Sequence, residues 1–410
     1  MLISLAVVAG SGVVGRVLWG QYEDHRDREA SRAKIDRACA RLVDPDAVLA
    51  LRGGAVRVKP DSDGATRIGT PGDRSFHDGK PTGSCRIYRV GEPGTTYAHF
   101  ELLVAREPGS DYANIVGSEE GPFERHGWDG PSRDMTRRAP EPLPQPLADG
   151  RSGYFTDDSV VVRARCKGNS EDETSLFVRA TAPDGEDVER VTESDRLALA
   201  DMATRATRKA AHKLGCRTRV AAPPHRLPEP PAKLGEPEKA AGACAWYARL
   251  VRESGRGELP DRALGAQAGS AAWQESCLLG VSPSLTTTLW NRHEKLMGDT
   301  NLGTALSTSP WWMQFESYFR DAARDVVSDG LGRKQVTLRP GTAGSINGLW
   351  WASSTCRGEP AVHVMTSSYP YERVVAQRAR EALRAYVSDV AERRDCTDVK
   401  LPPASAFQDR

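Results

Sequence analysis

The sequence predicts an α+β fold in which one small, disulfide-braced domain occurs twice in tandem, each copy combining an antiparallel sheet with a long C-terminal helix, after an N-terminal membrane helix. Three observations predict this organisation. The cysteines form two sets of four with similar spacing, the same order of expected helices and strands recurs in both halves, and the chain begins with an uncharged apolar run.

Residues 1–19 are expected to form a transmembrane anchor or a signal segment. Residues 2–15 carry no charge, and the apolar stretch resumes after Arg16 and continues to Trp19. A spanning helix needs roughly 20 residues, so the length is marginal. A cleaved signal peptide would need a basic leader and a small-residue cleavage site, and this segment shows no such leader. An uncleaved anchor is therefore favoured, with a buried N-terminal helix as the alternative.

Apart from Gly20, residues 20–35 are nearly all polar, with both charge signs interleaved and no helix breaker. This pattern is typical of a solvated helix. We expect a helical stalk that leads from the membrane into the first domain.

The spacing of the cysteines indicates an internal duplication. No Cys-x-x-Cys pair occurs, which argues against zinc ribbons and thioredoxin-like redox chemistry. The long middle interval nearly repeats, from 85 to 166 and from 277 to 356. The two sets are Cys39, Cys85, Cys166 and Cys216, and then Cys244, Cys277, Cys356 and Cys396.

The residues around the cysteines repeat as well. Cys39 and Cys244 each begin a short expected helix that ends in Arg-Leu-Val. Cys166 and Cys356 each end an expected strand, and a further strand follows at 175–180 and at 361–366.

Apolar residues also recur at matching positions before the last cysteine of each set. Their spacing describes a single stripe along a helix, so each copy should end in a long amphipathic helix. The two stripes are Leu199, Met202, Ala203, Ala206 and Ala210 in the first copy, and Ala379, Ala382, Leu383, Tyr386 and Val390 in the second.

These patterns set the expected domain boundaries. The first α+β repeat spans 36–220, a stiff Pro-rich linker spans 221–240, the second repeat spans 241–398 and a tail follows at 399–410. Within the second repeat, residues 317–327 are expected to form a helix.

An even number of cysteines beyond an anchor fits structural disulfides in an oxidising compartment. Three pairings are open within each copy, and we favour sequential pairing. Each bridge would stabilise the fold by roughly 3 to 4 kcal/mol. The alternative is buried free thiols in a cytosolic protein. The favoured pairs are Cys39 with Cys85, Cys166 with Cys216, Cys244 with Cys277, and Cys356 with Cys396.

No motif predicts catalysis, a metal site or a cofactor. The sequence holds no Gly-x-Ser-x-Gly elbow, no P-loop and no His-Glu-x-x-His pair, and its Gly-x-Gly-x-x-Gly at residues 10–15 lies inside the expected anchor. The formal net charge of +1 also gives no global field that would attract nucleic acid.

Tryptophan is concentrated in the second half, with adjacent pairs at 311–312 and 350–351. Neighbours on a strand face opposite sides of the sheet, so one member of the 350–351 pair should face away from the main core. It either packs under the loop that carries the other pair or lines an aromatic groove for a peptide or glycan. The candidate groove residues are Trp311, Trp312, Trp350 and Trp351.

The anchor, the Pro-rich linker and the cysteine-bracketed α+β repeats across 36–396 resemble those of uncharacterised secreted or membrane-anchored actinobacterial proteins. The resemblance extends to extracytoplasmic sensor and lipoprotein domains of that group, although no cysteine precedes Cys39 and the lipoprotein signal is therefore missing. It implies a location at the cell membrane, with the bulk of the chain outside, and carries over no active residues.

The expected function is a non-enzymatic binding or sensing module, tethered to the membrane by the N-terminal helix, whose second repeat faces a peptide, glycan or protein ligand. A cell-envelope hydrolase and a structural partner in an envelope complex are the alternatives. A pocket with converging His, Asp or Glu side chains would favour the enzyme. A Trp-lined groove would favour binding, and a flat apolar patch would favour assembly.

Overall fold

The structure is a computed structural model of the 410-residue chain. It confirms a mixed α+β protein built on antiparallel sheets. The described residues are 22–61, 83–90, 98–107, 114–117, 121–123, 134–139, 142–166, 174–183, 189–216, 218, 220–298, 301–307, 310–328 and 336–407.

The first sheet has the strand order β1-β2-β3-β8-β7-β6-β5, with every neighbouring pair antiparallel. In β7, Val160 and Val162 are buried on one face and Val161 on the other. A strand covered on both faces needs apolar residues at successive positions, which explains this β-branched run. The strands are β1 (Val58–Pro60), β2 (Gly83–Arg89), β3 (Phe100–Glu107), β5 (Gln145–Pro146), β6 (Gly153–Phe155), β7 (Ser159–Cys166) and β8 (Thr174–Thr181).

Helix α3 (Glu193–Lys213) covers one face of the first sheet, beside α2 (Pro45–Ala50) and the helical residues 22–38. It begins with a capping box in which the side chains of Thr192 and Asp195 each bond the other residue's backbone N–H. The stripe predicted for the first copy is confirmed. Its residues Leu199, Met202, Ala203, Ala206 and Ala210 are all fully buried.

The second sheet has the order β14-β15-β16-β11-β10-β9, and β17 pairs with β15 outside that path. Its neighbouring strands are also antiparallel. The strands are β9 (Arg262–Gly265), β10 (Gln274–Gly280), β11 (Trp312–Phe319), β14 (Gly344–Ile346), β15 (Leu349–Cys356), β16 (Glu359–Ser367) and β17 (Cys396–Lys400).

Helices α4 (Ala245–Ser254) and α7 (Tyr371–Arg394) cover one face of the second sheet, with α5 (Pro283–His293) and α6 (Leu302–Ser307) beside them. The stripe predicted for the second copy is confirmed, because Ala379, Ala382, Leu383, Tyr386 and Val390 are fully buried. Short 3-10 helices connect these elements: η2 (Met135–Arg137), η3 (Pro237–Lys239), η4 (Gly242–Cys244), η5 (Glu294–Leu296), η6 (Arg320–Arg324) and η7 (Ala404–Phe407).

The helix expected at residues 317–327 is wrong. Residues 317–319 complete the central strand β11, and only η6 (Arg320–Arg324) is helical before β12 (Val326–Ser328) begins. Apolar residues alternate along β11, with Met313 and Phe315 packed in the core that includes α4 and α7. This period of two is the pattern of a strand, and it outweighed the helix-favouring composition that follows it.

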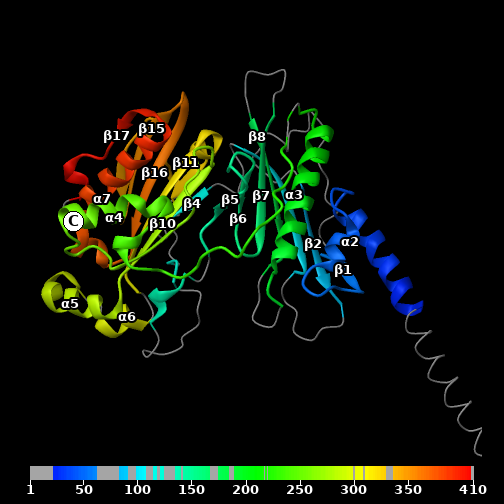
Figure 1. The fold of residues 1–410 in the computed structure, drawn as a ribbon, viewed down its shortest axis with the longest axis horizontal. Helices are drawn as coiled ribbons and strands as arrows, with labels where there is room; N and C mark the ends of the chain where they lie inside the picture. The colour runs from blue at the N-terminus through cyan, green and yellow to red at the C-terminus, as the bar shows by residue number, and fades with distance from the viewer. Residues whose placement is uncertain are drawn as a thin grey trace, which may run out of the picture.

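The two sheets turn their helix-free faces toward each other, so that helices lie on the outside of both (Figure 1). A small third sheet joins the halves, because β4 (Asn114–Val116) runs parallel to β12, which also pairs with β13 (Val336–Thr337). Apolar residues of both halves share two further clusters at this junction. The halves are therefore packed against each other at these clusters and through the third sheet.

Disulfides join three of the four predicted cysteine pairs: Cys39–Cys85, Cys244–Cys277 and Cys356–Cys396. Cys216 is disulfide-bonded as well. The side chain of Cys166 lies outside the described residues, so the fourth pairing stays a prediction. Among the described cysteines none is free.

The expected anchor at 1–19 lies outside the described residues. No helix in the described ranges is both long enough and apolar enough to cross a membrane. The expected stalk corresponds to the first part of the helix over 22–38, which is docked rather than detached from Asp27 onward. Arg57 forms an ion pair with Asp27, Ser31 bonds Val56, and Ile35 is fully buried.

The Pro-rich residues 221–240 contain no helix or strand before η3, yet they run along the molecule instead of through solvent. Leu227 is buried with the first core, and Leu234 is buried in the junction between the halves. The C-terminal residues also fold back, and Phe407 stacks on Trp350 at 5.6 Å between ring centroids.

Candidate functional site

The structure does not bring the four tryptophans of the expected groove together. Trp311 and Trp350 lie in the helix-covered core, where Trp311 stacks on Trp290 and Tyr371. Trp312 and Trp351 point from the opposite face into two separate clusters. Strand alternation separates each adjacent pair in this way. Three of the four are at most 7% exposed, so these side chains form no common open surface.

A serine–histidine contact lies in the second core but is sealed from solvent. His363 Nδ1 is 2.7 Å from Ser317 Oγ, its Nε2 is 2.9 Å from Ser354 Oγ, and Ser317 also bonds the hydroxyl of Tyr386. Burial lowers the pKa of His363 to about 3. The imidazole is therefore neutral and bonded on both sides, as expected of a satisfied core network. A general base must reach a substrate proton, which this enclosed ring does not.

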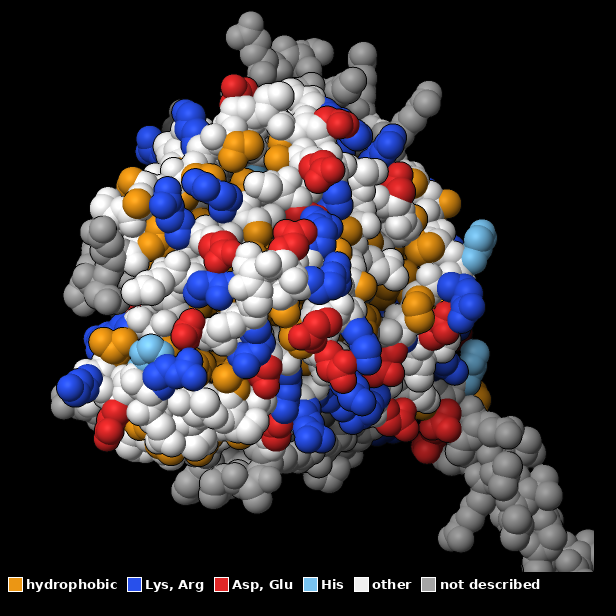
Figure 2. Space-filling view, turned by 60° about the vertical axis from the view of Figure 1, so that its left-hand side comes forward, with side chains coloured by type: hydrophobic (Ala, Val, Ile, Leu, Met, Phe, Trp, Pro, Cys, Tyr) orange, Lys and Arg blue, Asp and Glu red, His pale blue; other side chains and the backbone are white. Residues whose placement is uncertain are grey.

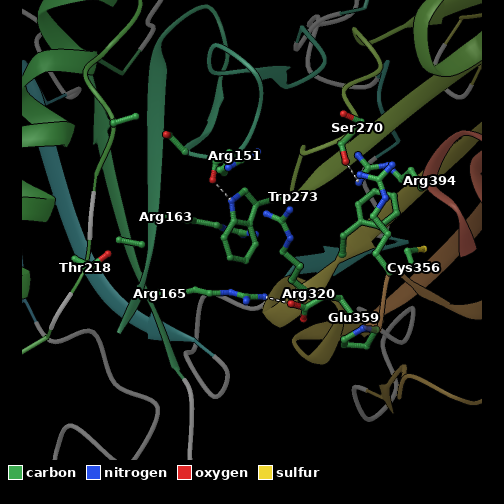
Figure 3. A pocket seen from close by; sticks show the side chains of 16 residues that line it. Arg151, Arg163, Arg165, Thr218, Ser270, Trp273, Arg320, Cys356, Glu359 and Arg394 are labelled. Atoms are coloured by element: carbon green, nitrogen blue, oxygen red, sulfur yellow. Dashed lines mark hydrogen bonds and ion pairs between the residues drawn. The ribbon is translucent and has the colours of Figure 1, made fainter. Parts of the chain in front are cut away.

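An open cavity of about 890 Å³ lies between the two sheets (Figure 3). It is larger than the volume of an inorganic ion and falls in the range of roughly 300–1,000 Å³ that holds small organic ligands. The acidic side chain in its lining is Glu359, whereas arginines approach from both halves. The lining arginines are Arg151, Arg163, Arg165, Arg320, Arg357 and Arg394.

Secondary structure explains how these arginines converge. Arg163 and Arg165 alternate with apolar residues on β7, so both project from the helix-free face of the first sheet. Arg320 follows the last residue of β11, and Arg394 is the last residue of α7. Arg151 precedes β6. Segments far apart in the sequence therefore supply like charges to one space.

Part of this charge is compensated within the protein. Arg394 donates to buried Glu275 at 2.8 Å and lies over the ring of Phe319. Burial alone would raise the pKa of Glu275, but Arg394 and Arg393 lower it overall. Arg165 forms an ion pair with Glu359 at 2.6 Å.

The ring of Trp273 contacts one guanidinium group from each half of the molecule. The arginine carbons Cζ of Arg163 and Arg320 each lie 5.3 Å from the centre of its ring, within cation–π range. Its indole N–H donates to the carbonyl of Arg151 at 2.8 Å. Burial lowers the pKa of Arg320, and the nearby positive charge of Arg165 lowers it further. An anion in the cavity would relieve that repulsion.

The lining does not fit a metal ion. Among the described residues no group of three or more His, Cys, Asp or Glu side chains could hold one. Guanidinium groups have no lone pair to offer and instead donate up to five N–H bonds each. The arrangement suits carboxylate, phosphate or sulfate oxygens, which arginine can bind through two parallel hydrogen bonds.

Sequence reasoning missed this cavity. The β-branched run in Val160–Cys166 predicts a strand, but two arginines spaced by two residues on a buried strand are also a polar feature that needs a partner. Trp273 lies outside the adjacent tryptophan pairs on which the groove prediction rests.

The surface around α4 to α7 gives a contrast. Figure 2 shows Lys and Arg intermingled with Asp and Glu over the face that it displays. Such mixing creates no strong field on that face, so the cluster of arginines in the cavity is a local feature.

Comparison with protein-family models, curated proteins and solved structures finds no match to this chain.

Proposed function

We propose that the chain is a non-enzymatic binding or sensing module whose ligand is an anion held in the arginine-lined cavity between the two sheets. The observation that carries this proposal is the convergence of arginines from β7, from η6 and from the ends of other elements on one open space. Placing like charges together costs free energy unless an opposite charge joins them. The ligand therefore belongs to the junction of both halves and not to the second half alone.

The hydrolase alternative receives less support. Among the described residues, His363 is a histidine that hydrogen-bonds serine, and its side chain is fully buried in the core. The cavity itself contributes Glu359, already paired with Arg165, and no histidine lines it among the described residues.

Two features support the idea that the halves arose by tandem duplication of one domain. The order β1-β2-β3-β8-β7-β6 corresponds strand for strand to β9-β10-β11-β16-β15-β14. In each half a disulfide joins the second strand of that order to a residue at a helix end, although Cys39 follows the helix over 22–38 and does not begin a helix as expected, whereas Cys244 precedes α4. We therefore propose the repeats at 36–220 and 241–398.

Anion binding is tested by thermal unfolding of the full chain with and without inorganic phosphate, sulfate, citrate and phenyl phosphate at constant ionic strength. A ligand at 100 times its Kd adds about 2.7 kcal/mol of stability. The variant Arg165→Gln should reduce the shift, whereas Arg205→Gln should not. Arg205 pairs with Asp201 on the exposed side of α3, far from the cavity lining. No shift with any anion would refute the proposed function.

We further propose that residues 1–19 tether the protein to the cell membrane, with its bulk in an extracytoplasmic, oxidising compartment. The apolar run and the disulfides support this location. Deleting residues 1–19 should move the protein from the membrane fraction to the soluble fraction. Unchanged membrane association after the deletion would contradict the tether.

A further inference from the structure

The backbone of Arg320 has a conformation that residues other than glycine rarely adopt. Its φ is +62°, in the left-handed region, at the junction of β11 and η6. Such backbone strain survives only where the surroundings enforce it, and it clusters at ligand-holding positions. Figure 3 shows the guanidinium of Arg320 beside the ring of Trp273.

The guanidinium of Arg320 differs from that of Arg394 in its partners. Arg394 donates to Glu275 and to the carbonyls of Gly269 and Ala272. Arg320 contacts the ring of Trp273, but across the described part of the chain no hydrogen bond or ion pair to its side chain is found. Because Arg320 lines the cavity, a planar oxyanion there could accept two of its five N–H donors.

The cavity has room for more than an inorganic anion. At about 890 Å³ it lies in the range of roughly 300–1,000 Å³ that is typical of sites for small organic ligands. Phe319 and Pro360 add apolar surface to the lining. A carbon skeleton against these groups would gain free energy by leaving water.

We infer that the ligand is an organic oxyanion, a small molecule whose phosphate, sulfate or carboxylate group binds Arg320 while its carbon body fills the rest of the cavity. Arg320 is the residue that selects for negative charge. This inference rests on the anion-binding function proposed above and adds to it the class of the ligand and the residue that recognises it.

The ligand class is tested by titration calorimetry of the full chain at fixed ionic strength with matched probes. The three charged probes share a phenyl ring and differ in the anionic group: phenyl phosphate, phenyl sulfate and phenylacetate. Phenol has the ring without the charge, and inorganic phosphate has the charge without the ring. We expect at least one charged ring compound to bind, phenol not to bind, and inorganic phosphate to bind at least tenfold more weakly. The tightest of the three identifies the anionic group.

Arg320→Gln should weaken the affinity for the tightest probe by about tenfold to 100-fold, the usual effect of losing a hydrogen bond to a charged group. Arg320→Gly should weaken binding at least as much. Because glycine adopts a positive φ without strain, this variant should unfold no earlier than the wild type when no probe is present. That combination separates ligand recognition from a role in folding. Arg205→Gln is the matched control and should keep the wild-type affinity.

The possible failures are distinct. If the probes bind and Arg165→Gln weakens them but both Arg320 variants bind as the wild type does, the assignment of Arg320 is wrong and the anion-binding function stands. Equal affinity for inorganic phosphate and the ring compounds overturns the organic ligand. Absence of binding by every anion overturns the proposed function itself.

Discussion

The indole N–H of Trp273 donates to the backbone carbonyl of Arg151 across 2.8 Å, and this bond joins the two halves of the molecule. Trp273 precedes β10 in the second sheet, whereas Arg151 lies in the turn before β6 in the first. The backbone carbonyl of Trp273 in turn accepts from the N–H of Phe319 at the end of β11. Trp273 therefore connects the junction between the two sheets, through Arg151, with Phe319 in the lining of the cavity.

Replacing Trp273 should destabilise the ligand-free protein in two graded steps. Trp273→Phe keeps an aromatic ring and removes the bond to Arg151, for an expected loss of about 1 kcal/mol plus a smaller packing loss. Trp273→Ala also empties a site that is 3% exposed, and large-to-small changes of this kind cost about 3–5 kcal/mol. Urea unfolding measures both. Equal stability of the alanine variant and the wild type would show that the junction does not depend on this residue.

Gly150 should tolerate no side chain, because the halves meet closely there. Its φ is +81°, and a Cβ atom would lie 2.7 Å from the Cα of Ala272 in the other half. Gly215 is the matched control, since its φ is +70° but no atom of the described residues lies within 4 Å of its Cβ position.

Both alanine variants carry the cost of a left-handed conformation, about 1–2 kcal/mol. Gly150→Ala should lose a further 1–3 kcal/mol, roughly, from overpacking. The difference between the two variants in urea unfolding therefore measures the closeness of the junction. Equal losses would mean that the halves separate easily at this point.

The elements that sequence alone predicted are those set by local periodicity. The stripes on α3 and α7 follow from residues near each other in the chain, such as Leu199 and Met202. The cavity is different. Arg163 and Arg320 meet at Trp273 only because two sheets stack face to face, and no local pattern encodes that contact. Alternation predicted that one of Trp350 and Trp351 would leave the core, but not what would cover it.

The disulfides should contribute a measurable share of the stability. The bridge Cys244–Cys277 closes a loop with a sequence separation of 33 between α4 and β10. The chain-entropy model assigns about 3 to 4 kcal/mol to a loop of this size. The double variant Cys244→Ala/Cys277→Ala should lose about that much in urea unfolding, and reductant should destabilise the wild type more than the variant.

Mass spectrometry of unreduced peptides from exported protein checks the pairing directly. It should recover the three observed links and a fourth between Cys166 and Cys216. Recovery of all eight thiols free would contradict the disulfide assignment and favour a reducing compartment.

Acid should destabilise the protein partly through His363. Its pKa is lowered from about 6.5 to about 3 because burial disfavours the charged ring. In the unfolded chain the same ring takes up a proton below about pH 6.5. Its contribution to stability is therefore complete above that pH and is lost as the pH falls toward 3, at up to about 1.4 kcal/mol per pH unit.

Other groups titrate in the same window, so a variant is needed to isolate this one. His99, whose pKa is lowered to about 4 mainly by burial, acts in the same direction. Glu316, whose pKa burial raises to about 7, acts in the opposite direction between about pH 4.5 and 7. The difference in unfolding free energy between the wild type and His363→Gln excludes the contributions of His99 and Glu316, because both groups are present in the two proteins.

The wild type should exceed His363→Gln in unfolding free energy at pH 7, and the gap should narrow steadily as the pH is lowered to 4.5. Urea unfolding at several pH values measures it. His212→Gln, which replaces an exposed histidine on α3, is the matched control. The difference in unfolding free energy between the wild type and His363→Gln could instead stay constant with pH. The ring would then either stay uncharged in the unfolded chain or reach solvent in the folded one. The second case would reopen the serine–histidine contact of Ser354 and His363 as a candidate for chemistry.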